Sequence, residues 1–257
     1  MTEKGPQIQE IRRLQEALAG ELIRTPVVRC AAIEGVVGGD TRVTGKLEFL
    51  QRTGTFKARG ALGTLRSLAP AQLAAGVTAV SAGNHAIATA FAAQAMGTTA
   101  KVVMMKSANP ARVRACRDYG AEVVHAEDVH AAFEVAERIQ REEGRYFLHP
   151  FEGPGVALGT GTLGLEICEQ VGDLDALIVP IGGGGLIAGV ANAVKQLAPA
   201  CEIIGVEPEG ADTMRRSRAA GEPQSIERVA TIADSLGAPF AMPYSFALAE
   251  QHVDDLV

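Results

Sequence analysis

The sequence predicts an α/β protein with two open, twisted, mainly parallel sheets that are flanked by helices. Short valine-rich runs alternate with alanine-rich or amphipathic stretches through residues 77–149 and again through 163–208. Strands and helices in alternation form parallel sheets that helices cover, joined by right-handed crossovers. Glycine is frequent, at 29 of 257 residues, and aromatic residues make up only 4%. We therefore expect close backbone contacts and several ligand-binding loops.

The central run predicts four strands and three helices. Asn109 followed by Pro110 marks a helix start, and Gly97, Gly120 and Gly144 mark helix ends. We expect strands at 77–81, 100–105, 121–126 and 145–149, and helices at 85–97, 109–120 and 129–144.

The second run follows a stretch rich in Gly and Pro, 149–161, which we expect to be a loop. The strand-like segment 41–50 needs a pairing partner and is assigned to the same unit. The chain then divides into a small α/β domain, 76–149, inserted into a large domain formed by 1–75 and 150–257, with a ligand cleft between them. Within the second run we expect helices at 163–171 and 186–197, strands at 175–181 and 201–208, and a loop at 182–185.

Charge and composition exclude several classes of partner. A net charge of −6 gives no reason to expect nucleic acid or an anionic membrane. Cys30, Cys116, Cys168 and Cys201 are far apart and offer no zinc-ligand spacing. Residues 1–18 are polar and helix-like, without the apolar core of a signal peptide, and no apolar run approaches the ~20 residues of a membrane span. We expect a cytoplasmic protein.

Lys57 lies in the stretch TGTFKARGA, residues 53–61, directly after Phe56. Thr53 or Thr55 fits the N-cap of a helix that continues from here. A first-turn lysine lies against the positive end of the helix dipole, and packing beside an aromatic ring removes water; both effects lower its pKa. Lys57 is therefore either a solvated surface cation or an amine suited to Schiff-base chemistry.

A second candidate loop contains Ser81, Ala82, Gly83, Asn84 and His85, between a predicted strand and a predicted helix. Free N–H groups at the N-terminus of a helix bind carboxylates and phosphates. The same residues also fit a plain Ser/Asn helix cap. The sequence leaves both interpretations open.

A third candidate loop consists of four consecutive glycines, 182–185. Each glycine costs conformational entropy, and the compensating gain is a backbone that closes around an anion, so we expect a phosphate site. Gly183, Gly185 and Ala188 also match the G-x-G-x-x-A pattern, with Glu207 at the end of the next strand. A nicotinamide-nucleotide oxidoreductase is therefore an alternative.

Together the three loops resemble those of fold-type II pyridoxal-phosphate enzymes, in the branch of serine/threonine dehydratases and serine racemases. The resemblance extends along nearly the whole chain and keeps the family's order of motifs. These motifs are RTP (24–26), KLEFLQRTGTFKARGA (46–61), SAGNHA (81–86), HPF (149–151), GGGGLIAG (182–189), GVEPEGA (205–211) and TIADSL (231–236).

The resemblance implies a tryptophan synthase β-like fold, pyridoxal 5′-phosphate as the cofactor, and the large domain as its binding unit. Lys57 would hold the cofactor covalently and move the substrate's α-proton, with Phe56 packed beside the ring and Asn84 on the phenolic oxygen. Arg59 would be a plain charge. The residues that would hold the phosphate are Gly182, Gly183, Gly184, Gly185 and Leu186. Those that would frame the substrate carboxylate are Ser81, Ala82, Gly83, Asn84 and His85.

The implied activity is β-elimination of L-threonine, L-serine or a related β-hydroxy amino acid to a 2-oxo acid and ammonia. The implied assembly is a homodimer or homotetramer. Serine racemase-type activity is an alternative, and so is a non-catalytic remnant that binds the cofactor. Racemases of this branch have a serine where this chain has Ala82, which favours elimination.

Three further positions depart from the family pattern. The family's cation site resembles Glu207, the carbonyl of Ala211 and an acidic residue where Thr213 stands here, so we expect divalent-cation binding to be weak or absent. Ser235 stands where relatives have a glycine, so we expect an altered substrate pocket. Relatives continue for tens of residues past Val257 and supply the partner of the pyridine nitrogen; without that segment we expect exposed apolar sheet surface.

Overall fold

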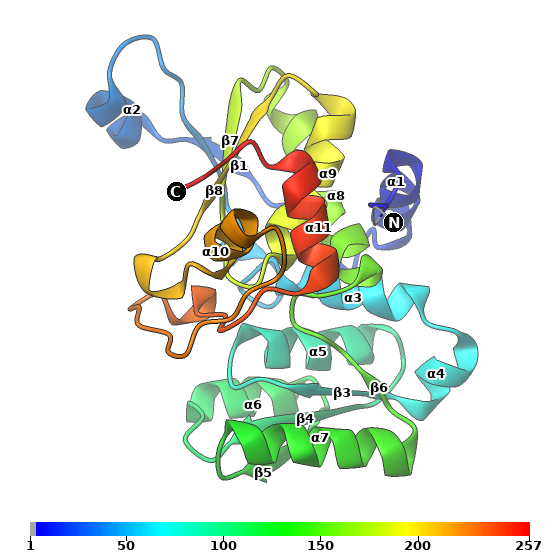
Figure 1. Ribbon diagram of the computed structural model, residues 1–257. Helices are drawn as coiled ribbons and strands as arrows, with labels where there is room; N and C mark the ends of the chain where they lie inside the picture. Colours follow the sequence, from blue (N-terminus) through cyan, green and yellow to red (C-terminus); the bar gives the residue numbers. More distant parts are fainter. Residues whose placement is uncertain (1–3) are drawn as a thin grey trace.

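The computed structural model describes residues 4–257, so residues 1–3 of the predicted N-terminal helix lie outside the described part. Figure 1 shows two bodies: a lower one built around a four-stranded sheet, and an upper one that contains the long helices α8 and α9. Helix α3 lies where the two bodies meet, and it contacts α5 of the lower body and α8 of the upper one.

The four-stranded sheet of the lower body has the order β5-β4-β3-β6, and all its pairings are parallel. Helix α5 packs against β3 and β4 on the side that faces the upper body, while α7 contacts all four strands from the other side (Figure 1). Asn109 and Asp128 cap α6 and α7 through the N–H groups of Ala111 and Ala131. The predicted central run is thus confirmed. The elements are β3 (Val77–Val80), α5 (Asn84–Ala95), β4 (Ala100–Met105), α6 (Pro110–Asp118), β5 (Glu122–Ala126), α7 (Val129–Glu143) and β6 (Tyr146–Phe147).

The upper body contains a parallel three-stranded sheet of order β7-β8-β9. Val179, Ile187 and Ile203 belong to its apolar core, whereas Ile178 on β7 is 68% exposed. The predicted strand, glycine loop, helix and strand of this run are confirmed. The elements are α8 (Pro154–Val171), β7 (Ala176–Pro180), α9 (Gly185–Leu197), β8 (Glu202–Val206), η2 (Glu209–Ala211), α10 (Thr213–Ala220), η3 (Asp234–Leu236), α11 (Pro243–His252) and β9 (Asp255–Leu256).

The N-terminal segment adds a separate two-stranded antiparallel sheet. The strand predicted at 41–50 is shorter in the structure, because the chain turns into a 3-10 helix after Lys46. It pairs with β1 rather than with the three-stranded sheet. The elements are α1 (Ile8–Ala17), β1 (Val27–Arg29), α2 (Ala31–Val37), β2 (Thr44–Lys46), η1 (Glu48–Leu50), α3 (Lys57–Ser67) and α4 (Pro70–Ala75).

Helix α8 corrects the prediction of a loop at 149–161, because the helix already begins at Pro154. Its glycines allow neighbouring helices to approach closely. A Cβ on Gly159 would overlap the carbonyl oxygen of Arg59 on α3, and a Cβ on Gly164 would lie 2.8 Å from the carbonyl oxygen of Val190 on α9. Glycine normally disfavours a helix, but here the tight packing of α3, α8 and α9 offsets that preference.

Candidate functional site

Lys57 is the first residue of helix α3. The N-cap is Phe56, whose side chain makes no capping bond, so the prediction of Thr53 or Thr55 as the N-cap is wrong by one position or more. Thr55 contributes a long contact instead, since its hydroxyl accepts from the N–H of Lys57 at 3.4 Å. Lys57 Nζ lies 5.2 Å from the centre of the Phe56 ring and donates to the carbonyl oxygen of Pro150 at 2.7 Å.

A small internal cavity surrounds the Lys57 side chain. It is lined by Phe56, Lys57, Gly60, Ala61, His85, His149, Pro150, Val156 and Thr160. Within the described residues Lys57 makes no ion pair with a carboxylate. Burial lowers the pKa of Lys57 to about 8. The amine is therefore substantially neutral in mildly alkaline solution, which suits a nucleophile or a general base.

The two histidines of this cavity are neutral near pH 7. Burial, reinforced by the charge of Lys57, lowers the pKa of His85 to about 3 and that of His149 to about 4. His85 Nε2 donates to the carbonyl oxygen of Leu148 at 2.9 Å, because a carbonyl only accepts. His149 Nδ1 accepts from the N–H of Glu152 at 3.0 Å. Lys57 is thus the cavity group that titrates nearest neutral pH.

The loop of residues 81–85 brings the N-terminus of α5 to the same cavity through His85. Ser81 Oγ accepts from the N–H of Gly83 at 3.1 Å. In the described chain the N–H groups of Asn84 and His85 donate to no acceptor, and neither does the Asn84 side-chain amide. These free donors at a helix N-terminus suit a carboxylate.

The glycine loop meets the N-terminus of α9. Gly184 is the N-cap, with φ +90, a conformation that glycine adopts without strain. Over residues 4–257, no acceptor pairs with the six successive backbone N–H groups of residues 182–187. Buried N–H groups are normally paired, so this row of free donors suits an anion, and the dipole of α9 adds to the attraction.

Thr160 connects the glycine loop to the lysine cavity. Its hydroxyl donates to the carbonyl oxygen of Gly185 at 2.9 Å, and its side chain lines the cavity with Lys57. The Phe151 ring lies directly against Gly183, where any Cβ would overlap it. Two of the three loops singled out from the sequence thus contribute Lys57 and His85 to the cavity, and the glycine loop adjoins it through Thr160.

Five residues of the site, His149, Pro150, Phe151, Val156 and Thr160, have no role in the prediction from sequence. The HPF motif at 149–151 entered only through the family resemblance, and residues 154–161 were expected to be a loop. Glycines at 155, 159, 161 and 164 are the signal that indicates a closely packed helix here. That spacing is compatible with Val156 and Thr160 on one helix beside α3.

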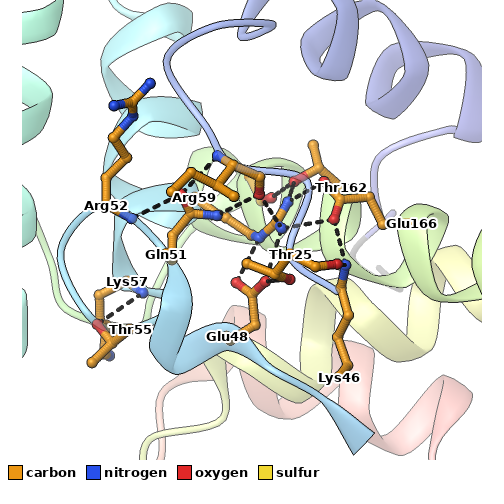
Figure 2. Close-up of polar contacts among 12 residues, drawn as sticks. Thr25, Lys46, Glu48, Gln51, Arg52, Thr55, Lys57, Arg59, Thr162 and Glu166 are labelled. Carbon is orange, nitrogen blue, oxygen red and sulfur yellow. Dashed lines mark hydrogen bonds and ion pairs between the residues drawn. The ribbon is translucent and has the colours of Figure 1, made fainter. Parts of the chain in front are cut away.

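Arg59 is completely buried, so its interpretation as a plain charge is wrong. Figure 2 shows its guanidinium between the carboxylates of Glu48 and Glu166, with Lys46 beyond Glu166. A buried arginine needs such partners because an unpaired charge away from water is unstable. These partners lie on η1 and α8, which the local sequence TGTFKARGA does not reveal.

Glu207 follows β8 and holds the start of α10. Its two carboxylate oxygens accept from the N–H groups of Met214 and Arg215, each at 2.8 Å. Burial raises the pKa of Glu207, and these two bonds oppose that rise. Within residues 4–257 no group of three or more His, Cys, Asp or Glu residues is placed to hold a metal ion. A cation site at Glu207 and Ala211 stays a prediction, and it would have to compete with the helix cap.

The residues around Lys57 fit pyridoxal phosphate. A desolvated lysine of lowered pKa suits the aldehyde, and the unpaired N–H row of residues 182–187 suits the phosphate. The alternative of a nicotinamide nucleotide would use Glu207 to bind a ribose, but in the structure both oxygens of this carboxylate accept N–H groups at the start of α10. Comparison with known proteins agrees: a family model described as pyridoxal-phosphate dependent enzyme matches residues 18–257.

The chain belongs to this family. Phenylserine dehydratase of Ralstonia pickettii is 55% identical over 252 residues, which cover 98% of this chain and 77% of that enzyme. L-threonine ammonia-lyase of Thermotoga maritima is 37% identical over 251 residues, which cover 97% of this chain and 62% of that enzyme. Both names agree with the dehydratase branch that the motifs resemble.

Solved structures of the pyridoxal-phosphate enzymes share the fold. Maize serine racemase superposes with a TM-score of 0.93 at 36% identity, covering 99% of this chain and 77% of that one. The processed form of threonine deaminase isoform 2 from Solanum lycopersicum superposes with a TM-score of 0.89 at 34% identity, covering 100% of this chain and 77% of that one. The predicted fold class is thereby confirmed. None of the helices in residues 4–257 is long and apolar enough to cross a membrane.

Proposed function

We propose that this chain is a pyridoxal-phosphate-dependent ammonia-lyase that converts β-hydroxy α-amino acids to 2-oxo acids and ammonia. The observation that carries the proposal is the burial of Lys57, with a pKa of about 8, in a cavity that is also lined by His85 of the first turn of α5 and by Thr160, whose hydroxyl donates to Gly185 at the start of α9. The 55% identity to a phenylserine dehydratase supports the dehydratase chemistry and adds aryl-substituted β-hydroxy amino acids to threonine and serine as substrates.

The residues that would hold the cofactor are Lys57, Phe56, Asn84 and the glycine loop with Leu186. When bound, pyridoxal phosphate supplies an aldehyde and an electron sink for the charge left at the substrate's α-carbon. Lys57 Nζ, in its neutral form, would be the group that attaches to this aldehyde. The unpaired N–H groups of residues 182–187 and the dipole of α9 would hold the phosphate.

The loop of residues 81–85 orients the substrate. Its free N–H groups would bind the carboxylate, while the Asn84 side-chain amide would bind the phenolic oxygen of the cofactor. The lowered pKa of Lys57 Nζ would suit this amine to remove the α-proton as a general base near neutral pH. His85 and His149 stay neutral and serve as walls that exclude water.

Ala82 favours elimination over racemisation. Racemisation needs a second proton donor on the opposite side of the α-carbon, and an alanine methyl group has no proton to give. The one hydroxyl of this loop belongs to Ser81, at the position before Ala82, and its oxygen accepts the N–H of Gly83. Serine racemase-type activity is therefore the weaker alternative.

Assembly, location and domain division complete the proposal. We place the enzyme in the cytoplasm as a homodimer or homotetramer, with 76–149 as the small domain. Light scattering of the purified protein measures the mass of the assembly. Limited proteolysis near residues 76 and 149 tests the domain boundaries.

The deciding experiment gives the purified protein pyridoxal phosphate and, separately, phenylserine, L-threonine and L-serine. We expect 2-oxo acid and ammonia in equal amounts from at least one of the three, and no product from Lys57→Ala. Chiral chromatography of the remaining substrate measures racemisation in the same reactions. A rate of D-isomer formation that exceeds 2-oxo acid formation would contradict the proposal, as would bound cofactor without turnover of any of the three.

A further inference from the structure

Four charged side chains form a closed cluster beneath the first turn of α3. Together with two threonines they make up what we call the Arg59 network, which consists of Thr25, Lys46, Glu48, Arg59, Thr162 and Glu166 (Figure 2). Its members come from the segment before β1 and from β2, η1, α3 and α8. Three of them belong to the motifs RTP and KLE, which the cofactor and substrate sites leave without a role.

Arg59 donates all five of its N–H groups within this network. Nε and Nη2 donate to the two oxygens of Glu48 at 2.7 and 2.9 Å. Nη1 and Nη2 donate to the two oxygens of Glu166 at 2.8 and 2.9 Å. Nη1 also donates to the hydroxyl of Thr162 at 3.1 Å. Two bidentate forks on one guanidinium fix both its position and its plane.

The rest of the network is equally complete. Lys46 Nζ donates to Glu166 at 2.6 Å and to the carbonyl oxygen of Thr25 at 2.7 Å, and the Thr25 hydroxyl donates to Glu48 at 2.6 Å. Two cations face two carboxylates, so the cluster is neutral. The Arg59 side chain is 0% exposed and that of Glu166 is 5% exposed. A neutral, fully paired cluster of this kind has one stable geometry rather than several.

The side chains of Lys57 and Arg59 project from opposite sides of α3, because a step of two residues along an α-helix corresponds to a rotation of roughly 200° about its axis. Lys57 points into the cavity and Arg59 into the network. The N-cap residue Phe56 makes no capping bond to the first turn of α3, and the Thr55 hydroxyl makes only a long contact of 3.4 Å with the N–H of Lys57. The double fork therefore sets the rotation of this turn about the helix axis, and that rotation determines where Lys57 Nζ lies.

We propose that Arg59 is a positioning residue for Lys57, held by Glu48 and Glu166, and that the RTP and KLE motifs support it. Arg59 does not touch the cavity; it acts through the backbone of residues 57–59. The inference rests on the proposed function, because it takes Lys57 as the residue that captures the cofactor.

The test compares Arg59→Lys with Arg66→Lys in the full chain. Lysine keeps the positive charge but cannot make two forks. Arg66 is exposed in the last turn of the same helix and donates to the carbonyl oxygen of Ala17, so it is a matched control. Each protein is mixed with pyridoxal 5′-phosphate and sampled over time into borohydride. Mass spectrometry of peptides then measures the reduced adduct at Lys57, and thermal unfolding measures stability.

We expect Arg59→Lys to slow adduct formation at Lys57 by about 10–100-fold, since a misplacement of the order of 1 Å has such an effect, while Arg66→Lys leaves the rate unchanged. A purely structural role would lower the melting temperature alone. A folded Arg59→Lys protein with the wild-type rate overturns the inference. If Arg59→Lys does not fold, Glu48→Gln replaces it in the test, because this variant removes the negative charge of one of the two carboxylates that hold Arg59. A wild-type rate of adduct formation in Glu48→Gln would also overturn the inference.

Failure of the proposed function gives a different pattern. A wild-type protein that forms the Lys57 adduct but eliminates none of the β-hydroxy amino acids contradicts the function and leaves the positioning role standing. The adduct rate itself needs no turnover. The two conclusions are therefore tested separately.

Discussion

The first turn of α3 carries two buried cationic side chains, Lys57 and Arg59, on opposite sides, and their surroundings differ. On one side Lys57 faces two neutral histidines and a single carbonyl oxygen, and burial lowers its pKa to about 8. On the other side Arg59 faces two carboxylates that accept four of its hydrogen bonds. Both surroundings exclude water. The number of opposite charges decides whether the cation becomes reactive or becomes structural.

This contrast explains why one helix carries both residues. A reactive amine must keep its protonation state adjustable, so it lacks a carboxylate partner. A helix start that bears such an amine gains little stability from it. The paired arginine two residues later supplies a rigid attachment that the lysine does not provide.

The largest effect is expected for Lys57→Met, which keeps most of the side-chain volume and removes the amine. Covalent capture of pyridoxal phosphate at this position should disappear, and elimination of β-hydroxy amino acids should fall by at least about 10³-fold, as for loss of a nucleophile. Borohydride reduction followed by peptide mapping measures the capture, and 2-oxo acid formation measures the activity. Residual activity above about a tenth of wild type would show that another group performs the chemistry.

Stability should change in the opposite sense on the two sides. Arg59→Met leaves Glu48 and Glu166 facing each other and should lower the free energy of unfolding by about 3–5 kcal/mol. Lys57→Met removes a charge that burial disfavours. In the cofactor-free chain at pH 7 it should leave that free energy unchanged or raise it by on the order of 1 kcal/mol. Urea unfolding measures the free energy of unfolding of both variants. Similar decreases in Arg59→Met and Lys57→Met would contradict the proposed difference between the two sides of the helix.

The smallest effect is a shift in pH dependence. The folded pKa of Lys57, about 8, lies below the ordinary value of 10.5. Protonation is therefore disfavoured in the folded state, so the contribution of Lys57 to stability falls as the pH drops from the ordinary value to about 8 and is constant below that. The rate of adduct formation should rise with pH and level off above about 8, where an ordinary lysine would still be rising. A measured rate that keeps rising up to about pH 10 would show that the Lys57 amine is exposed to water and has an ordinary pKa.

Local sequence determined most of the elements. The alternation of apolar and helical runs located the strands of the lower sheet and the helices between them, and the caps at Asn109 and Asp128 follow from residues two or three positions away. The glycine loop and the loop of residues 81–85 were also recognisable, because a helix N-terminus after a strand is a local feature. Lys57 itself remained ambiguous until the three loops were considered together.

Only the tertiary structure decided the roles of Arg59, Glu207 and the glycines of α8. Arg59 and Glu166 are 107 positions apart, so nothing near KARGA indicates that the charge is buried. The glycines of α8 look like a loop until α3 and α9 are seen to pass close enough to require them. The periodicity of a chain specifies its helices and strands, whereas the partner of a buried charge and the spacing of two helices depend on residues that only the folded chain brings together.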